Sequence, residues 1–308
     1  MKKAFTLVEI ITTIVILGIL SAGTLVSIKH LYLKVAKTKT LSDLSSDSQV
    51  IVDQISSLFS ERVPSTVIGY KKDGSFETIY NLNSIYNIIE WIGVASESFK
   101  SGYYSGFVDL NASDKNSLTL SSPNINISGI NNTMHNKFNA NLRDIALMFA
   151  GSFDNGLLTL SNDFNNSFGW HGNNHNQIYK ISNISSNSIT LATSPKEIYE
   201  KYYLVDSAYA IARGDDIDLN ATCIKDLNQS DNNNTLFLFY NYRPWEGHTF
   251  CADPNGSGQD GNVTILSKNV KGLEFKLINN DILFNLTLEK KVRGSQNSII
   301  VSKQKVVF

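Results

Sequence analysis

Charge is sparse in this 308-residue chain, and neither sign is in excess. Lys and Arg number 27, Asp and Glu number 28, the net charge is −1, and 18% of the residues are charged. A platform for nucleic acid needs a clustered excess of positive charge, so we expect no nucleic-acid partner. Proline is also scarce, whereas Asn, Ser and Tyr are abundant, which suits a β-rich exported domain with many polar loops.

Motifs typical of catalysis are missing as well. The chain has no phosphate-binding glycine loop, no G-x-S-x-G and no H-E-x-x-H. His171 and His175 are four residues apart, but the Gly and Asn residues around them disfavour a helix that would place both imidazoles on one face. We therefore predict that the protein is not an enzyme. A membrane-anchored periplasmic enzyme is the alternative from another functional class.

What the chain does have is one long apolar run at its start. From Phe5 to Ile28, about 24 residues contain a single ionisable group, and a helix of that length spans the hydrocarbon core of a bilayer. Lys2 and Lys3 precede the run and, by the positive-inside rule, hold the amino terminus in the cytoplasm. Two simpler interpretations are a plain signal anchor and a secretory signal cut at the small residues 21–23.

The single ionisable group inside this run is Glu9. An acid within a membrane helix costs about 2.5 to 3.5 kcal/mol on insertion scales and requires a partner. No basic residue of the run supplies one. The counter-charge that we expect is the amine of a neighbouring copy, exposed by a cut between Ala4 and Phe5.

The residues KKA followed by FTLVEIITTIVILGIL resemble the prepilin-type leader of type IV pilins and type II secretion pseudopilins. The resemblance implies that a prepilin peptidase removes the leader and methylates the new amine. Ala4 then ends the leader, and Phe5 is the methylated first residue. Glu9 matches the buried acid of the family and Gly18 its helix glycine. Two positions differ, because Ala4 replaces the usual Gly and Val26 replaces the Pro of many major pilins. The second difference points to a minor or initiating subunit.

This resemblance also implies an α+β, pilin-like fold, in which a long membrane-spanning helix packs on a globular domain rich in antiparallel β-sheet. We expect residues 1–4 to be the leader, 5–28 the transmembrane half of the helix, 29–62 its exposed amphipathic half, and 63–308 the periplasmic or extracellular domain. In the amphipathic half, a stripe of apolar residues predicts that one helix face is packed: Leu31, Val35, Leu41, Leu44, Ile51, Ile55 and Leu58.

The function implied by the resemblance is structural. We expect a minor, initiating subunit of a type II secretion pseudopilus or type IV pilus-like filament that supports protein secretion. A pilus-tip adhesin or a minor pilin for DNA uptake is the alternative. The implied partners are other pilin or pseudopilin subunits, the prepilin peptidase, an inner-membrane platform protein with its assembly ATPase, and membrane lipid. The implied location is a single pass through the inner membrane with the amino terminus cytoplasmic, followed by incorporation into a periplasmic or cell-surface filament.

Several later segments predict strands. Hairpins are expected over 67–80 and over 178–192, and single strands over 144–151, 202–212 and 235–242. Residues 84–99 predict a short helix, with a strand over IEWIG as the alternative, and 102–141 predict loops around small strands. Residues 162–177 predict a long polar loop. Near the carboxyl end, Ile282, Phe284, Leu286 and Leu288 alternate with more polar neighbours and predict a strand with one apolar face.

Two cysteines are present, Cys223 and Cys251. In an extracytoplasmic compartment such a pair predicts one disulfide, and free thiols are the alternative. No second pair exists from which to build a thiolate metal site.

One loop has the donor order of a calcium site. Asp253, Asn255 and Ser257 alternate as in the first half of a calcium loop, and Asp260 follows. Thr264 takes the twelfth position, where an EF-hand needs a bidentate Glu. No cofactor is required for the expected function, so the alternatives are bound Ca²⁺ and a plain turn.

Four asparagines have an acid two residues before them and Ser or Thr two residues after them: Asn111, Asn220, Asn228 and Asn233. The pattern resembles the extended N-glycosylation acceptor of some bacteria. Coincidence in a chain so rich in Asn is the alternative.

Overall fold

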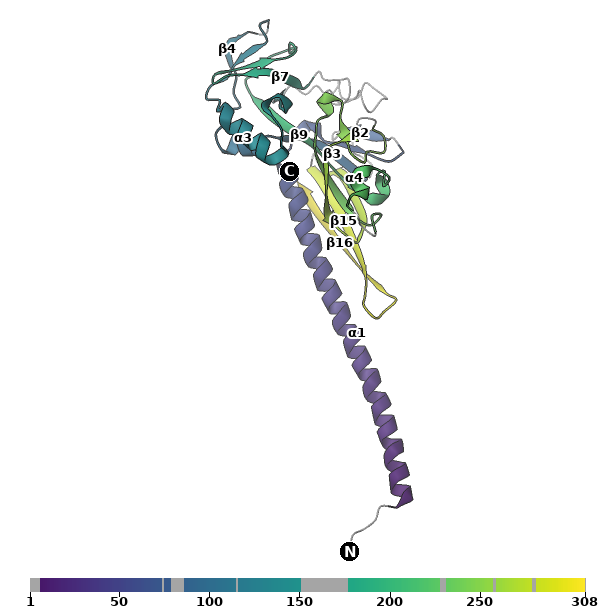
Figure 1. Ribbon diagram of the computed structural model, residues 1–308. Helices are drawn as coiled ribbons and strands as arrows, with labels where there is room; N and C mark the ends of the chain where they lie inside the picture. Colours follow the sequence, from purple (N-terminus) through teal and green to yellow (C-terminus); the bar gives the residue numbers. More distant parts are fainter. Residues whose placement is uncertain are drawn as a thin grey trace.

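The computed structural model describes residues 6–73, 75–78, 86–114, 116–150, 177–227, 231–256, 259–278 and 281–307. One long helix, α1 (Leu7–Ser60), dominates its shape, and the first half of α1 stands clear of a β-rich domain that packs on its second half (Figure 1). The predicted α+β fold, a long apolar helix followed by antiparallel sheet, is confirmed.

α1 continues without a break for 54 residues. Its sequence contains no proline, so every backbone N–H beyond the first turn can donate to the carbonyl four residues earlier. The helix ends at Ser60, where the N–H of Glu61 donates to the Leu58 carbonyl and the N–H of Arg62 donates to the Phe59 carbonyl. A short 3₁₀ turn, η1 (Pro64–Thr66), follows and leads into the first strand.

The second half of α1 buries one face against the domain. The buried residues are Thr40, Leu44, Ser48, Ile51, Val52, Ile55 and Phe59. Only part of the predicted apolar stripe lies on this face, because Leu31, Val35 and Leu41 are 63%, 59% and 50% exposed. The main body of the domain covers α1 only from about Thr40 onward, so it leaves these three side chains exposed.

The main sheet is organised around β9 (Tyr202–Arg213). One edge of β9 pairs with β3 (Ile88–Val94), and the other edge pairs first with β6 (Ala146–Phe149) and then with β10 (Leu236–Tyr242). The remaining strands extend these three branches: β1 (Ile68–Tyr70) and β2 (Phe76–Thr78) beyond β3; β7 (Tyr179–Ile184), β8 (Ser188–Leu191), β5 (Thr119–Ser121) and β4 (Asp109–Asp114) beyond β6; and β13 (Asn262–Ser267) beyond β10.

β9 is covered on both faces, which explains why its sequence is a continuous apolar run. Tyr209 and Ile211 lie in the core that also contains the buried face of α1. Ala208 and Ala210 lie in a second core on the other face, together with Trp245 and other aromatic residues. The sheet therefore separates two hydrophobic cores.

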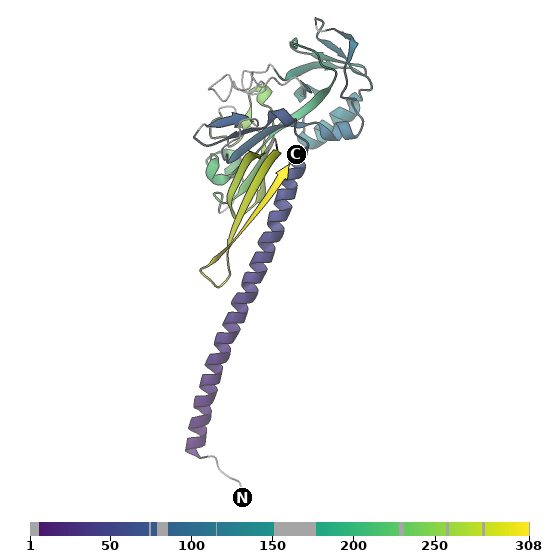
Figure 2. The same ribbon diagram turned by 180° about the vertical axis from the view of Figure 1, so that it is seen from behind.

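A second antiparallel sheet runs beside α1 in both views (Figures 1 and 2). It consists of β14 (Val270–Ile278), β15 (Asp281–Lys291) and β16 (Ser298–Val307). The predicted alternation in β15 is confirmed, since Ile282, Phe284, Leu286 and Leu288 are buried and their neighbours are not. Lys305 on β16 pairs with Asp53 on α1 at 2.8 Å.

The hairpin between β15 and β16 reaches down to α1. A Cβ atom placed on Gly294 would lie 3.4 Å from Tyr32 Cε1 and 3.8 Å from Leu33 Cδ2. The tip of the hairpin therefore contacts α1 well before the main body of the domain does. Figure 1 shows the tip as the part of the domain nearest the amino-terminal half of α1.

The predicted hairpins, β1–β2 and β7–β8, are present. The predicted helix over 84–99 is wrong for most of its length, and the alternative, a strand over IEWIG, is confirmed, because β3 contains these residues and only α2 (Ser96–Lys100) is helical. Burial on both faces of β3 removed the hydrophobic periodicity that distinguishes a strand from a helix.

The prediction for 102–141 missed a helix, α3 (Ile127–Phe138). The side chain of its N-cap, Asn126, accepts a hydrogen bond from the Gly129 N–H. The predicted polar loop 162–177 falls outside the described residues, apart from Gln177.

The other short elements connect these strands: η3 (Leu142–Asp144), η5 (Gly214–Asp216), α4 (Thr222–Lys225), η6 (Pro244–Glu246), β11 (Thr249–Phe250) and β12 (Gln259–Asp260).

A buried ion pair fastens α3 to the main sheet. Lys137 Nζ lies 3.0 Å from Asp206 Oδ2 and 3.0 Å from Glu97 Oε2. The Asp206 side chain is 2% exposed, and among the described residues its Oδ1 has no hydrogen-bond partner. Burial raises the pKa of Asp206 to about 6, in spite of the neighbouring ammonium group. The buried charge is thus only partly compensated.

Asp206 should make the domain more stable on mild acidification. An unfolded Asp has a pKa of about 3.9, so between about pH 6 and pH 4 the folded state binds the extra proton. The free energy of unfolding of the wild type, minus that of Asp206→Asn, should rise by about 2 kcal/mol between pH 7 and pH 4.5. Denaturant unfolding of both chains at each pH measures this difference.

Asp53→Asn is the matched control for this prediction. Hydrogen bonds from Gln49 and Lys305 lower the pKa of the exposed Asp53, so the same difference for this variant should fall on acidification. If the Asp206 difference also falls, the pKa of the folded-state carboxyl lies below its unfolded value and the prediction is wrong.

Candidate functional site

α1 begins with a ring of hydrogen bonds between Thr6 and Glu9. The backbone N–H and the hydroxyl of Thr6 both donate to Glu9 Oε2 at 2.9 Å, and the Glu9 N–H donates to Thr6 Oγ1 at 3.3 Å. This arrangement is a capping box, which satisfies donors that the first turn of a helix leaves unpaired. Ala4 and Phe5, the predicted processing residues, lie outside the described residues.

The sequence interpretation missed Thr6. The signal was present, because Thr followed three residues later by Glu at the start of an apolar run predicts a helix that begins immediately after the Thr. The prediction treated Glu9 only as a partner for another chain. The structure gives it a second role inside its own helix.

Every side chain of α1 from Leu7 to Ile28 is exposed in the single chain. By length and composition this helix can cross a membrane, and none of its apolar window is buried in the domain. Gly18, a predicted assembly residue, faces open space, since a Cβ atom on it would meet nothing within 4 Å. A surface of this kind requires lipid or other apolar helices around it.

Four hydroxyl groups of this segment, those of Thr12, Thr13, Thr24 and Ser27, donate to carbonyls of α1 itself. Thr12 Oγ1 donates to the Val8 carbonyl at 3.0 Å, Thr13 Oγ1 donates to the Glu9 carbonyl at 2.7 Å, and Ser27 Oγ donates to the Gly23 carbonyl at 3.0 Å. The carboxylate of Glu9 is therefore the only charged group that an apolar environment around Leu7 to Ile28 would have to accommodate.

Cys223 and Cys251 form a disulfide, with Cα atoms 6.5 Å apart across a sequence separation of 28. The bridge joins α4 to the loop that follows β11. Closing a loop of this length stabilises a domain by about 3 to 4 kcal/mol on the chain-entropy model. Because disulfides persist in oxidising compartments, the bridge favours a location outside the cytoplasm.

The predicted calcium ligands differ in burial and in hydrogen-bond partners. The Asp253 side chain is buried, and its Oδ1 accepts the Asn255 N–H at 2.9 Å. Asp260 is 54% exposed and lies 3.1 Å from His248 Nδ1. Ser257 falls outside the described residues. Within the described ranges, no group of three His, Cys, Asp or Glu side chains is placed to hold a metal ion. Calcium binding stays a prediction.

The predicted glycosylation residues Asn111, Asn220 and Asn233 are exposed, and Asn228 lies outside the described residues. In two of these sites the preceding acid has a structural role. Asp109 Oδ1 accepts the Asn111 N–H at 3.0 Å, and Asp218 Oδ1 accepts the Asn220 N–H at 2.9 Å. These are Asx turns, so the Asp-x-Asn spacing has an explanation in loop geometry. Glycosylation stays a prediction.

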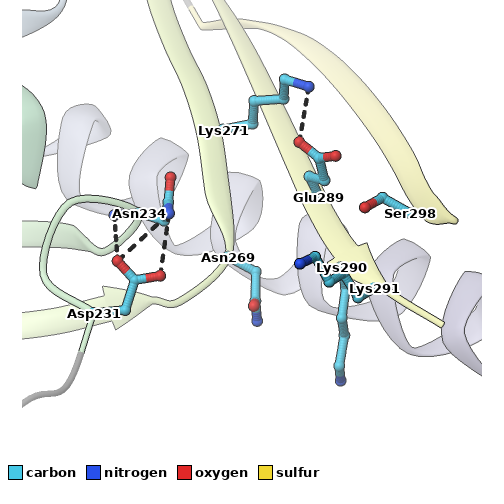
Figure 3. Close-up of a pocket in the computed structure, with 8 residues that line it drawn as sticks. All are labelled: Asp231, Asn234, Asn269, Lys271, Glu289, Lys290, Lys291 and Ser298. Atoms are coloured by element: carbon cyan, nitrogen blue, oxygen red, sulfur yellow. Dashed lines mark hydrogen bonds and ion pairs between the residues drawn. The ribbon is translucent and has the colours of Figure 1, made fainter. Parts of the chain in front are cut away.

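A polar cleft of about 500 Å³ opens beside the second sheet (Figure 3). Its lining consists of Asp231, Asn234, Asn269, Lys271, Glu289, Lys290, Lys291 and Ser298. Both carboxylates of the lining interact with neighbouring side chains: Glu289 forms an ion pair with Lys271 at 2.7 Å, and Asp231 accepts a hydrogen bond from Asn234 at 3.1 Å. The lining contains no histidine or cysteine, so its ionisable groups are these two carboxylates and three lysines.

Comparison with known proteins supports the amino-terminal motif. Residues 1–25 match the family model described as the prokaryotic N-terminal methylation motif. No curated protein and no solved structure matches the chain. The predicted prepilin-type motif is confirmed by this match, and together with the long apolar helix it gives the chain a pilin-like layout.

A calcium titration tests the loop. Millimolar calcium should raise the Tm of the protein if oxygen atoms around Asp260 hold the ion, because a ligand that binds only the folded state stabilises it. Asp260→Asn should remove the shift. This carboxylate is a better target than Asp253, whose buried side chain supports the fold. An unchanged Tm in the wild type, or equal shifts in both chains, would discard calcium at this loop.

Proposed function

We propose that this protein is a minor, initiating subunit of a type II secretion pseudopilus or a related type IV pilus-like filament. The observation that carries the proposal is one acid, Glu9, at the start of an otherwise apolar and fully exposed span that matches the methylation motif. Such a span is suited both to a bilayer and to a bundle of like helices. The β-rich domain then lies on the outer side of the filament.

The proposed assembly step pairs two subunits through charge. A prepilin peptidase cuts after Ala4, and the new amine of Phe5 is methylated. Glu9 of one subunit then accepts the Phe5 amine of its neighbour. A carboxylate can accept about four hydrogen bonds, and Thr6 supplies two, both to Oε2, so the capping box leaves room for the amine. In an apolar bundle this pairing is strong, because an unpaired acid there is costly.

Exposed apolar residues extend the assembly surface beyond the span. Leu31, Val35 and Leu41 are each at least half exposed and belong to no core of their own domain. They continue the apolar surface of α1 toward the domain. We assign them to contacts between helices of neighbouring subunits, which an inner-membrane platform protein and its ATPase would bring together.

The proposed orientation places the domain on the periplasmic side. The disulfide favours this side, because it needs an oxidising compartment. Charge counts alone oppose it, since two lysines precede the span and four follow within 11 residues of Ile28. The leader and the export of a long folded domain must therefore set the orientation against the local charge bias.

Processing should give a mature chain that starts at methylated Phe5. Expression with a prepilin peptidase, followed by intact mass measurement and sequencing of the amino-terminal peptide, measures this directly. The same mass reports any glycan on Asn111, Asn220, Asn228 or Asn233. A product that keeps Met1, or one cut after residues 21–23, would contradict the proposal.

Glu9→Ala should be processed normally but should not enter filaments, because the neighbour's amine would lose its counter-charge. Thr12→Ala is the matched control, since it also removes a polar group from the span but leaves the carboxylate in place. Cleavage is read from the mobility shift of the membrane fraction, and assembly from the sheared filament fraction. Normal assembly of Glu9→Ala would refute the pairing.

A further inference from the structure

Seven of the chain's 27 Lys and Arg residues lie in two short segments that contain no acid. Four are lysines on α1, in residues 29–39, and three lie on the β15–β16 hairpin, in residues 290–293. All seven are exposed: Lys29, Lys34, Lys37, Lys39, Lys290, Lys291 and Arg293. We call this set the cationic collar.

The contact between Gly294 and Tyr32 brings the two segments to the same level along α1. They are about 260 residues apart in sequence, yet the hairpin places Arg293 next to the helix turn that holds Tyr32. Figures 1 and 2 both show the hairpin tip alongside α1 below the body of the domain. The collar is therefore a product of the fold and not of the sequence around the span alone.

This level corresponds to the lipid headgroups. Tyr32 is four residues beyond Ile28, or about 6 Å along the helix, and the headgroup layer is about 5 to 7 Å deep on each side of the hydrocarbon core. Tyr32 is 51% exposed, as expected of an aromatic residue at a membrane interface. Lys39, the farthest lysine on α1, is about 16 Å beyond Ile28, within about one Debye length of the headgroup layer.

The chain neutralises the collar only weakly: Glu289, whose charge attracts Lys291, forms its ion pair with Lys271. Among the described residues, no ion pair joins any of the seven cations to a carboxylate. Figure 3 illustrates the contrast, because Lys271 is paired with Glu289 while no dashed line reaches Lys290 or Lys291. Cations on the exit side of a span also disfavour translocation. Their concentration here requires a ligand outside the chain.

We propose that the cationic collar binds the phosphate groups of anionic phospholipids on the face of the membrane where α1 emerges. Lys29 and Arg293 lie at headgroup depth, and the other five cations form an upper tier that attracts the negative surface. The Arg293 guanidinium can hold a phosphate through two parallel hydrogen bonds. The hairpin tip thus gives the domain a second point of attachment to the bilayer, beside α1 itself.

This proposal depends on the membrane anchoring proposed above. The test uses the full chain in lipid nanodiscs at one copy per disc, with a fluorophore on Gln296→Cys at the hairpin tip. Discs contain either neutral phosphatidylcholine or a mixture with about one third phosphatidylglycerol, and both contain a lipid with a spin-labelled headgroup. We expect quenching to be about two- to threefold stronger in the anionic discs, and the difference to disappear at high salt.

Neutralising the hairpin should remove this dependence on anionic lipid. The variant combines Lys290→Gln, Lys291→Gln and Arg293→Gln. The matched control changes the exposed Lys225, Lys268 and Lys276 to Gln, which removes the same charge outside the collar and should leave the quenching pattern unchanged.

Three results would overturn the proposal. Quenching could be equal in the two kinds of disc, or the hairpin variant could keep the dependence on anionic lipid. The dependence could also arise only with two copies per disc, which would assign the collar to the acids of a second subunit. Failure of the chain to enter discs at all would instead refute the anchoring itself, and the proposal with it.

Discussion

The structure depends on one helix that meets two different surroundings. The same 54 residues of α1 are exposed and apolar on all sides at one end and carry a single buried face at the other. At the domain end, Phe59 packs against Trp91 of the main sheet at 4.7 Å between ring centroids and against Phe284 of the second sheet at 5.3 Å. These contacts fix both sheets to α1, so whatever surrounds the apolar end determines where the domain stands.

The Thr6–Glu9 capping box changes how the acid in the span should be regarded. In a single chain the Glu9 carboxylate already has hydrogen-bond partners, because the N–H and the hydroxyl of Thr6 both donate to it. An incoming amine adds charge to an oriented acceptor. The free energy of the proposed pairing between subunits would therefore be the difference between a capped and a fully paired carboxylate, and not the whole cost of an isolated acid in lipid.

The sequence predicted correctly those elements whose hydrophobic pattern is compatible with only one type of secondary structure. The alternation in β15 and the length of the apolar run each had a single structural reading, and both are present. β3 was ambiguous because burial on both of its faces leaves no periodicity, and α3 was missed because Asn and Gly conceal a helix held by Asn126 and by tertiary contacts. The approach of Gly294 to Tyr32 could not be predicted, since nothing local links positions so distant in the chain.

The unbroken course of α1 has a mechanical consequence. Without proline between Leu7 and Ser60, the helix runs as one continuous rod whose domain end is held by aromatic packing. A push applied to the lower end is then transmitted along the axis to the domain with little loss in bending. In the proposed filament, the helix and domain of such a subunit would move as one body, so displacement of the membrane end would carry the surface that the domain presents with it.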